Sequence, residues 1–563
     1  MTRPKKRPAK KPKRKARPAR RELKLEELQA IVERTESGPL AAEDRETLKA
    51  AVETLAFVTQ ELERKQVSIQ RLRKLLFGPS TEKTSQVVGE VCASPGAADE
   101  AAGPPGRGGA EKPKKKRKGH GRNSAAAYRG AEKVKIAHES LRGGERCPKC
   151  GQGKVYVQAQ PAVLVRVVGM APLRATVYER ERLRCNLCGE VFTAREPPGV
   201  GEAKYDETAA AMIGLLKYGC GLPFNRLERL QRGMGIPLPA ATQWETVERA
   251  AEALTPAYAE LVRQAAQGEI LHNDDTTMQI LELTGKRRRR AIEEGQVEPD
   301  QRTGIFTSGI VSADAGRLIA LFFTGRKHAG ENLARVLAAR AAELEAPIQM
   351  CDALSHNTAG DFETILASCT SHARRRFVDV ATSFPQECRH VLETLREVYR
   401  NDSAARERGM SPEERLRLHQ SQSGPLMETL KEWLEEQFEQ RKVEPNSPLG
   451  DAIDYMLKYW HELTLFLREP GAPLDNNICE RALKKAILHR KNALFYKTEN
   501  GARVGDLFMS LIHTAELCDA DPFDYLVALQ RHHQRVQLDP AAWVPWNFQE
   551  TLALLDVDPA PAR

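Results

Sequence analysis

Three acids lie where neighbouring elements of one sheet can bring their carboxylates together. Asp274 lies in a strand-like run from 270 to 278, Asp352 ends a short apolar run, and Glu480 begins a helical pattern. Converging carboxylates suit Mg²⁺, and two such ions about 3.5–4 Å apart promote phosphodiester transfer. Taken singly, a strand-terminal Asp is more often a turn or cap residue, and Glu480 is also consistent with an acid stabilised at a helix N-terminus. Their joint order predicts a metal-binding triad.

Two neighbouring acids need separate interpretation. Adjacent strand residues point to opposite faces, so only one of Asp274 and Asp275 can face the metals, and the role of Asp275 stays open. Asp475 is interpreted as an N-terminal cap for the helix that carries Glu480. Cations near these acids are predicted to contact DNA phosphates: Arg374, Arg375, Arg481, Lys484, Arg490 and Lys491. The cluster around His372 either contacts DNA or positions the active site.

Two Cys-x-x-Cys pairs predict a second kind of metal site. Each pair, Cys147 with Cys150 and Cys185 with Cys188, is followed directly by a glycine. An alternating, β-rich stretch from 155 to 184 separates the pairs. Four thiolates form a closed tetrahedral site for Zn²⁺. Since no coordination position stays open, the sequence predicts a structural or DNA-docking zinc ribbon.

The net charge of +10 is unevenly distributed. Residues 1–22 carry a net charge of +11 and residues 111–122 carry +6, which leaves the remainder mildly acidic. Such basic segments attract polyanions, and nucleic acid is the default partner, although a solvated tail is an equal alternative for a single run. No apolar run approaches the length of a membrane helix. These features predict a cytoplasmic, nucleoid-associated protein.

The acids require an element order that positions them. Three strands are expected at 270–278, 304–312 and 317–324, then a helix at 329–344 and a strand at 347–352. An arginine-rich polar hairpin extension is expected between the first two strands. This order predicts an RNase H-like core, in which acids on the first and fourth strands lie side by side. The expected fold class is therefore multidomain α+β.

Helical segments surround this core. Leucine heptads from Leu48 to Leu76 favour a coiled coil and hence a homodimer or higher oligomer, with one long amphipathic helix as the alternative. Residues 222–250 have a helix, glycine turn and helix pattern, which is typical both of a helix-turn-helix and of a plain helical hairpin.

The expected organisation follows the chain in nine segments. They are a disordered basic tail (1–22), a helical coiled coil (23–83), a basic flexible linker (84–125), a zinc ribbon (126–200), a helix-turn-helix-like DNA-binding segment (201–262), the first part of the RNase H-like core (263–384), a helical insertion (385–467), the last part of the core (468–518) and a C-terminal helical tail (519–563).

An ordered set of motifs along the chain resembles the transposases of insertion sequence 66 type, of the DDE class. The motifs are residues 75–83, both Cys-x-x-Cys pairs, residues 217–218, 222–226, 274–276, 371–377, 475–477 with 480–481, 490–492 and 545–547. The resemblance implies that Asp274, Asp352 and Glu480 are the metal ligands. Many relatives carry Glu where Asp275 stands, which favours Asp274. The long basic tail, the extended arginine-rich hairpin and Cys479 depart from the pattern.

The predicted function is therefore Mg²⁺-dependent cleavage and strand transfer of double-stranded DNA at the ends of an insertion sequence. Small accessory transposition proteins are implied partners. A non-catalytic zinc-ribbon DNA-binding protein, and a metal-dependent nuclease or resolvase on the same core, are the alternative predictions.

Overall fold

The computed structural model describes residues 45–46, 48–49, 140–157, 171–184, 191–195, 197–198, 201, 203–294, 302–314 and 316–557. The predicted basic tail, the linker and nearly all of the leucine heptads lie outside these residues, as do Cys185 and Cys188. The chain divides into two compact units, one of residues 96–174 and one of the remainder. Among the described residues, no helix is long and apolar enough to cross a membrane.

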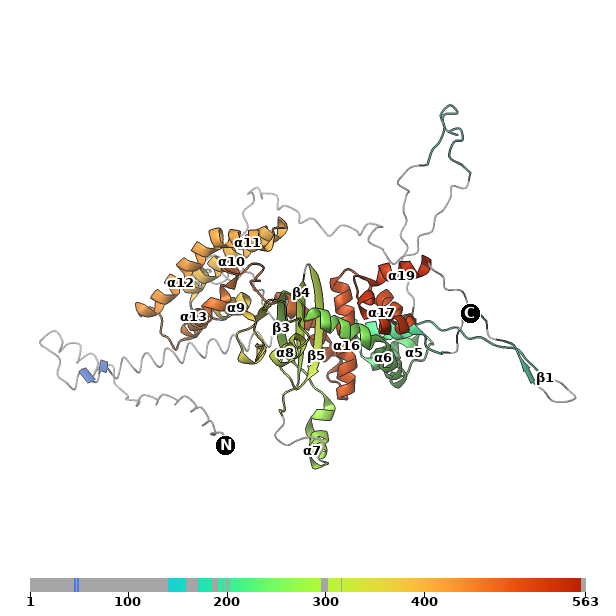
Figure 1. Cartoon of the computed structure of the whole chain (residues 1–563), viewed down its shortest axis with the longest axis horizontal. Coiled ribbons are helices and arrows are strands. Elements are labelled where there is room, and N and C mark those ends of the chain that lie inside the picture. Colours follow the sequence, from blue (N-terminus) through green and yellow to red (C-terminus); the bar gives the residue numbers. More distant parts are fainter. Residues whose placement is uncertain are drawn as a thin grey trace, which may run out of the picture. The chain divides into compact units, whose positions relative to one another are not determined.

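A five-stranded mixed sheet forms the centre of the larger unit (Figure 1). Its strands are β3 (Ile270–Thr277), β4 (Phe306–Asp314), β5 (Arg317–Gly325), β6 (Ile348–Cys351) and β7 (Ile365–Ser368). The order across the sheet is β5-β4-β3-β6-β7, with β3, β4 and β5 antiparallel and β6 and β7 parallel to β3. The predicted order of three strands, a helix and a fourth strand is confirmed, with α8 (Ala329–Leu337) as the helix. The four residues of β7 are too few to give a recognisable period.

Helix α16 (Glu499–Leu517) covers the β5 edge of the sheet. Asp506, Ser510 and Thr514 lie on successive turns of one helix face, and each accepts a hydrogen bond from a backbone N–H of β5, at 2.6, 3.0 and 3.1 Å. An edge strand left open presents such groups to other chains. The side chains of α16 therefore satisfy the edge where a further strand would pair.

Helices that precede the five-stranded sheet in the sequence pack with helices that follow α16. They are α4 (Glu207–Gly214), the π-helix η2 (Leu215–Gly219), α5 (Phe224–Gly233), α6 (Ala240–Ala265), α17 (Pro522–Arg531), α18 (His533–Leu538), η7 (Pro540–Trp543) and α19 (Phe548–Val557). α17 contacts both α4 and α6, and α18 and η7 contact α6. Figure 1 shows α17 and α19 beside α5 and α6. Segments that the sequence separates by about 250 residues thus share one helical body.

The expected helix, glycine turn and helix is confirmed as α5, a turn and α6. Gly235 has φ 77°, a left-handed conformation that favours glycine. The Glu228 carboxylate accepts a hydrogen bond from Ala240 N–H at 3.1 Å, and the Gln243 amide donates to Phe224 O at 3.0 Å. These contacts fix the angle between the two helices.

A helical lobe follows β7; it begins with α9, ahead of the predicted helical insertion at 385–467, and continues through that insertion. It consists of α9 (Thr370–Val380), α10 (Pro385–Glu407), α11 (Pro412–Leu418), α12 (Gly424–Glu439), α13 (Pro448–Lys458) and α14 (Trp460–Leu463). Its apolar core includes Leu392, Leu430 and Ile453 and continues into Ile348 and Met350 of β6. The lobe therefore packs directly on the half of the sheet that leads to Asp352.

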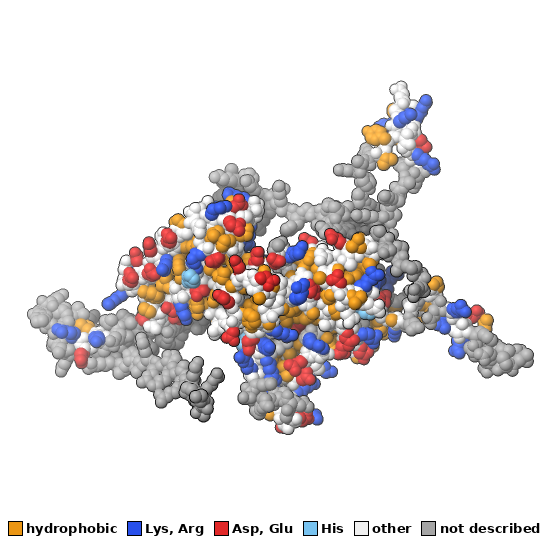
Figure 2. All heavy atoms as spheres, in the orientation of Figure 1, with side chains coloured by type: hydrophobic (Ala, Val, Ile, Leu, Met, Phe, Trp, Pro, Cys, Tyr) orange, Lys and Arg blue, Asp and Glu red, His pale blue; other side chains and the backbone are white. Residues whose placement is uncertain are grey.

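Two local expectations differ from the structure. The arginine-rich segment between β3 and β4 is a helix, α7 (Gly285–Glu293), and not a hairpin, because consecutive arginines are good helix formers. Figure 2 shows Lys and Arg side chains near α7 and acidic side chains over the helical lobe. In the described part of the expected β-rich stretch, only β1 (Arg182–Arg184) is a strand, paired with β2 (Val191–Thr193).

Candidate active site

The parallel pairing of β3 with β6 brings the first two predicted acids to the same level of the sheet. His272 is in register with Met350, so Asp274 and Asp352 each follow two residues later on adjacent strands. Side chains two residues apart share a face, and neighbouring strands lie about 4.8 Å apart. The expectation that the first and fourth strands lie side by side is confirmed.

A buried amide network holds the Asp352 carboxylate. The side-chain amide of Asn357 donates to Asp352 Oδ1, and Leu354 N–H donates to the same oxygen at 3.3 Å. The backbone carbonyl of Asn357 in turn accepts from Gln349 Nε2 and from Asn273 Nδ2, both at 2.7 Å. Because Asn273 and Gln349 are fully buried on β3 and β6, the turn after β6 is fixed to the sheet.

Asn476 fastens the third predicted acid's helix, α15 (Asn477–Ala493), to β3. Its Nδ2 donates to Asn273 O at 2.9 Å, and its Oδ1 lies 3.1 Å from His272 Nδ1. Burial lowers the pKa of His272 to about 4, so the ring is neutral at pH 7 and donates through Nδ1–H. Asn476 N–H also donates to Cys369 Sγ at 3.2 Å. The side chain and the backbone N–H of Asn476 therefore both hold the start of α15 in place.

The interpretation of Asp475 as the helix cap needs correction. The N-cap residue is Asn476, whose side chain bonds to β3 instead of to the helix. Asp475 still accepts a hydrogen bond from the first helical N–H, that of Asn477, at 3.1 Å. Glu480 lies in the first turn, as predicted.

Gly309 of β4 allows α15 to approach the sheet beside Asp274. It is in register with Asp274, and a Cβ added there would lie 3.0 Å from the Leu483 side chain and 3.4 Å from Cys479 Sγ. Burial raises the pKa of the Cys479 thiol well above its usual value, and the protonated Sγ donates to Gly309 O at 3.3 Å. The small residue on β4 therefore sets how closely Glu480 lies to the strand acids.

Electrostatics of Asp274 show that the acids crowd one another. Burial raises its pKa to about 7, and the carboxylates of Asp352, Asp275 and Glu480 add to the increase, while Asp275 N–H, donating to Asp274 Oδ1 at 2.8 Å, opposes it. A like charge nearby disfavours ionisation, and a bound cation removes that penalty. The arrangement thus favours a cation at Asp274.

Glu480 has an unsatisfied carboxylate oxygen. Its Oε1 is buried without a hydrogen-bond partner and lies 3.8 Å from His372 Nε2. One ligand atom from each of Cys369, His372 and Glu480 falls within 4.8 Å of the others, which makes this one of two possible metal-binding groups among the described residues. An unpartnered buried carboxylate oxygen is a suitable ligand for a cation.

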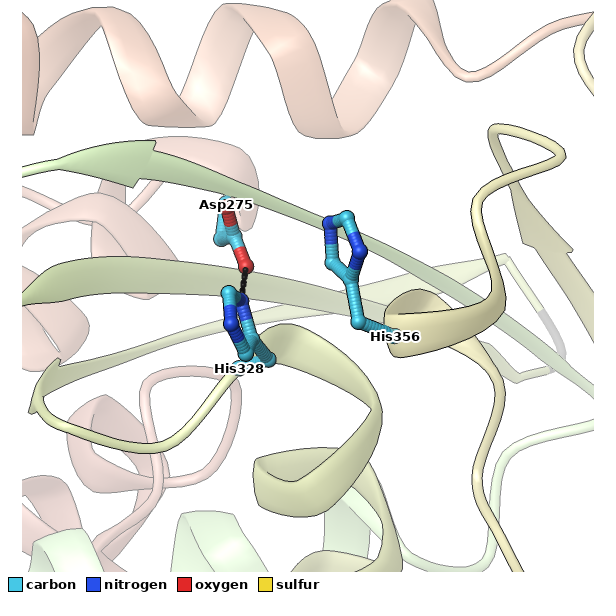
Figure 3. A group of neighbouring side chains, drawn as sticks. All are labelled: Asp275, His328 and His356. Atoms are coloured by element: carbon cyan, nitrogen blue, oxygen red, sulfur yellow. Dashed lines mark hydrogen bonds and ion pairs between the residues drawn. The ribbon is translucent and has the colours of Figure 1, made fainter. Parts of the chain in front are cut away.

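Asp275 points away from these acids, to the other face of β3. Its Oδ2 lies 2.8 Å from His328 Nδ1 and accepts a hydrogen bond from Ala329 N–H, the first residue of α8, at 3.3 Å. Figure 3 shows Asp275 directed at His328, with His356 facing the pair. The alternation of side chains along the strand thus assigns the two neighbouring acids to different faces.

The predicted cations of α15 differ in their surroundings. Arg481, Lys484 and Lys491 are exposed, and the two lysines, four and eleven residues after Glu480, lie on the same helix face as that acid. Arg490 is instead half-buried and donates through Nη1 to Thr276 Oγ1 at 3.1 Å and to Thr277 Oγ1 at 2.7 Å. Arg490 therefore ties α15 to the end of β3.

A cavity of about 300 Å³ adjoins Asp352. It is lined by Asp352, Ala353, Leu354, His372, Arg375, Arg376, Asp379 and Tyr455. The Arg376 guanidinium lies 3.8 Å from the centre of the Tyr455 ring. Of the two arginines predicted to bind DNA on α9, Arg375 lines the cavity and Arg374 does not. No local pattern pointed to Tyr455, because it lies 80 residues after Arg375, on α13.

The first half of the predicted zinc ribbon forms a tight loop in the smaller unit. Gly151 N–H donates to Cys147 O at 2.8 Å, and Cys147 N–H donates to Gly153 O at 2.7 Å. Hydrogen bonds from the backbone N–H groups of Gly153 and Gln152 lower the pKa of the Cys150 thiol. Amides directed at a sulfur fit a metal-bound thiolate.

Comparison with known sequences identifies relatives of the chain. The sequence model of the family described as "Transposase IS66 family" matches residues 203–504. Uncharacterized protein y4jD of Sinorhizobium fredii is 29% identical over 371 residues, which are 63% of this chain and 68% of that protein. Uncharacterized protein y4hP of the same organism is 26% identical over 439 residues, 72% of this chain and 74% of that protein. The family match spans every strand of the five-stranded sheet, the helical lobe and α15.

Proposed function

This chain belongs to the IS66 transposase family, and on that premise we propose that it cleaves DNA strands at the ends of an insertion sequence and joins them to target DNA. The observation that supports the proposal is the placement of the elements that carry the three acids: adjacent strands bring Asp274 and Asp352 to one level, and α15, which carries Glu480, is fastened to β3 by Asn476. The strand order β5-β4-β3-β6-β7 supports an RNase H-like core.

Asp274, Asp352 and Glu480 would hold Mg²⁺. The crowding of these carboxylates and the orphaned Glu480 oxygen fit hard divalent cations that prefer oxygen ligands. Two such ions, when bound, would activate the attacking oxygen and neutralise the leaving oxygen of the phosphodiester. Cys147, Cys150, Cys185 and Cys188 would hold a structural Zn²⁺.

The chain's own residues would position the acids and the DNA. Asn357 orients the Asp352 carboxylate, and Asn476 and Arg490 keep α15 on β3. Lys484 and Lys491, on the Glu480 face of α15, would neutralise backbone phosphates, as would Arg481 and the arginines 374 and 375 of α9. His372, between the cavity and Glu480, would orient that carboxylate.

A strand-transfer assay with DNA that carries the element's ends tests the proposal. Wild-type protein with Mg²⁺ should cleave and join, whereas a variant carrying both Asp352→Asn and Glu480→Gln should do neither. Activity that survives this double substitution would refute the triad. Cleavage without joining in the wild type would favour a nuclease or resolvase, and end binding without cleavage would favour a non-catalytic DNA-binding protein.

A further inference from the structure

A second cluster of metal-binding side chains lies on the face of β3 opposite Asp274 (Figure 3). Asp275 comes from β3, His328 directly precedes α8, and His356 belongs to the short 3-10 helix η4 (Ser355–Asn357). These are the second group, among the described residues, whose ligand atoms all lie within 4.8 Å of one another. Three separate elements therefore bring one carboxylate and two imidazoles together.

We propose that Asp275, His328 and His356 bind a divalent transition-metal ion of the Zn²⁺ class. Imidazole nitrogen suits zinc, copper, nickel and iron, whereas magnesium prefers all-oxygen sites. Two neutral imidazoles and one carboxylate leave a single negative charge against the ion, which is a common composition for three-ligand zinc sites. The fourth coordination position stays open to solvent or to an added ligand.

The separations suit one ion. Two ligand atoms about 2.0–2.1 Å from a tetrahedral zinc lie about 3.3 Å apart. Here His328 Nδ1 and Asp275 Oδ2 are 2.8 Å apart, and the remaining separations stay within 4.8 Å. Small side-chain rotations thus bring all three atoms to binding distance.

The surroundings hold two ligands firmly and leave the third adjustable. The side chains of Asp275 and His328 are 11% and 22% exposed, and the Phe306 ring lies 4.2 Å from the His328 ring, centroid to centroid. His356 is exposed, its ring centroid lies 4.5 Å from that of His328, and neither of its ring nitrogens has a hydrogen-bond partner among the described residues. His356 therefore has unused nitrogen ligands beside a rigid pair.

This second site adjoins the acids through the chain itself. Asp275 follows Asp274, and His356 precedes Asn357, whose amide donates to Asp352. A bound ion would tie β3, η4 and the start of α8 together directly behind the acid cluster. The metal binding itself does not depend on the proposed function, since the ligands belong to a separate group.

Zinc binding by the full-length chain tests the proposal. Protein freed of metal with a chelator is titrated with Zn²⁺ alone and with Zn²⁺ in excess Mg²⁺, and bound zinc is counted after gel filtration. The wild type should bind one zinc more than His328→Gln/His356→Gln, and excess Mg²⁺ should not displace it. His356→Gln alone should lower the affinity for this zinc ion by more than the roughly 10–100-fold that is lost when an outer-shell partner is removed.

Controls separate this site from other causes. His461→Gln, at an exposed histidine of α14, should bind as much zinc as the wild type. Since His356 is exposed, His356→Gln should unfold in urea at the wild-type midpoint when the chelator is present. Co²⁺ at this site should give visible absorption without the thiolate charge-transfer band that the cysteine pairs would produce. Equal zinc content and affinity in the wild type, in His356→Gln and in His328→Gln/His356→Gln would overturn the proposal.

Discussion

Asp274 and Asp275 are neighbours of the same residue type, yet they lie in opposite chemical environments. Asp274 faces α15 and other carboxylates, and its pKa is raised to about 7. Asp275 faces the start of α8, where His328 and the Ala329 N–H contact its Oδ2. One peptide unit thus separates a crowded acid from a paired one.

The comparison teaches that strand alternation and the helix on each face together decide what an acid can do. On the α15 face, the carboxylates of Asp352 and Glu480 add to the raised pKa of Asp274, and we propose that these three acids hold hard cations. On the α8 face, nitrogen ligands accompany a single carboxylate and suit zinc-class ions. The same strand therefore offers two different ligand sets, one on each side of the sheet.

The largest expected effect comes from replacing Asp274 and Asp275, one at a time, by asparagine. Asp274→Asn should reduce Mg²⁺-dependent strand transfer by more than about 100-fold, the upper range for losing an outer-shell partner, because a ligand itself is lost. Asp275→Asn should lower the rate far less. Rates from a gel-based strand-transfer assay decide this, with the exposed Asp454→Asn of α13 as the matched control. Equal losses in both variants would break the comparison.

Asn476→Ala tests how α15 is held against the acid face. It removes two side-chain hydrogen bonds to β3 and leaves Asn273 O and His272 Nδ1–H buried without partners. Each unsatisfied buried group costs about 1–3 kcal/mol, so the free energy of unfolding should fall by about 2–6 kcal/mol and activity should fall with it. Urea unfolding measures the loss. An unchanged unfolding free energy would show that other contacts hold the helix.

Gly309→Ala sharpens the comparison by changing packing without changing charge. The new Cβ would lie 3.0 Å from the Leu483 side chain, so this side chain and the part of α15 that carries it must shift by a few tenths of an ångström. Overpacking of this kind costs about 1–3 kcal/mol of stability. We also expect a lower affinity for Mg²⁺, because Glu480 moves away from the strand acids. Thermal unfolding and a Mg²⁺ titration of activity are the measurements. Gly325→Ala, where nothing lies within 4 Å of the added Cβ, is the matched control.

The smallest effect is a pH dependence that belongs to one face alone. A carboxyl whose pKa is raised by folding destabilises the native state once it ionises, so Asp274 should make the metal-free protein lose stability as the pH rises from about 4 to about 7. Asp274→Asn removes this loss, so its advantage over the wild type should grow with pH to about 1–2 kcal/mol, given about 1.4 kcal/mol per pKa unit before solvent screening.

The difference in unfolding free energy between the wild type and Asp274→Asn isolates the contribution of Asp274. It is measured by urea unfolding at each pH in the presence of a chelator. Buried His272, whose pKa is lowered to about 4, acts with the opposite sign below pH 6.5 but is present in both proteins, as is Asp506, whose pKa burial raises to about 7. A constant difference between pH 4 and pH 8 would mean that folding does not raise the pKa of Asp274. Added Mg²⁺ should remove the advantage of the variant.

The local sequence determined the strands, the helices and the order of the acids. The strand-like run around Asp274, the short apolar run before Asp352 and the helical pattern after Glu480 depend on residues close in the chain, and the structure confirms these elements. Capping at Ser411 is equally local: the Ser411 hydroxyl accepts from Glu414 N–H, three residues later in the chain.

Only the tertiary structure decided which side chains meet. The register of β3 with β6, the close approach of α15 at Gly309 and the assignment of Asp275 to His328 and His356 all join residues 53 to 174 positions apart, and no local pattern encodes such pairs. Asn476 shows the limit most clearly. From the sequence its neighbour Asp475 was the expected cap, but buried hydrogen-bonding groups on β3 required a partner, and Asn476 is the residue that folding brings to them.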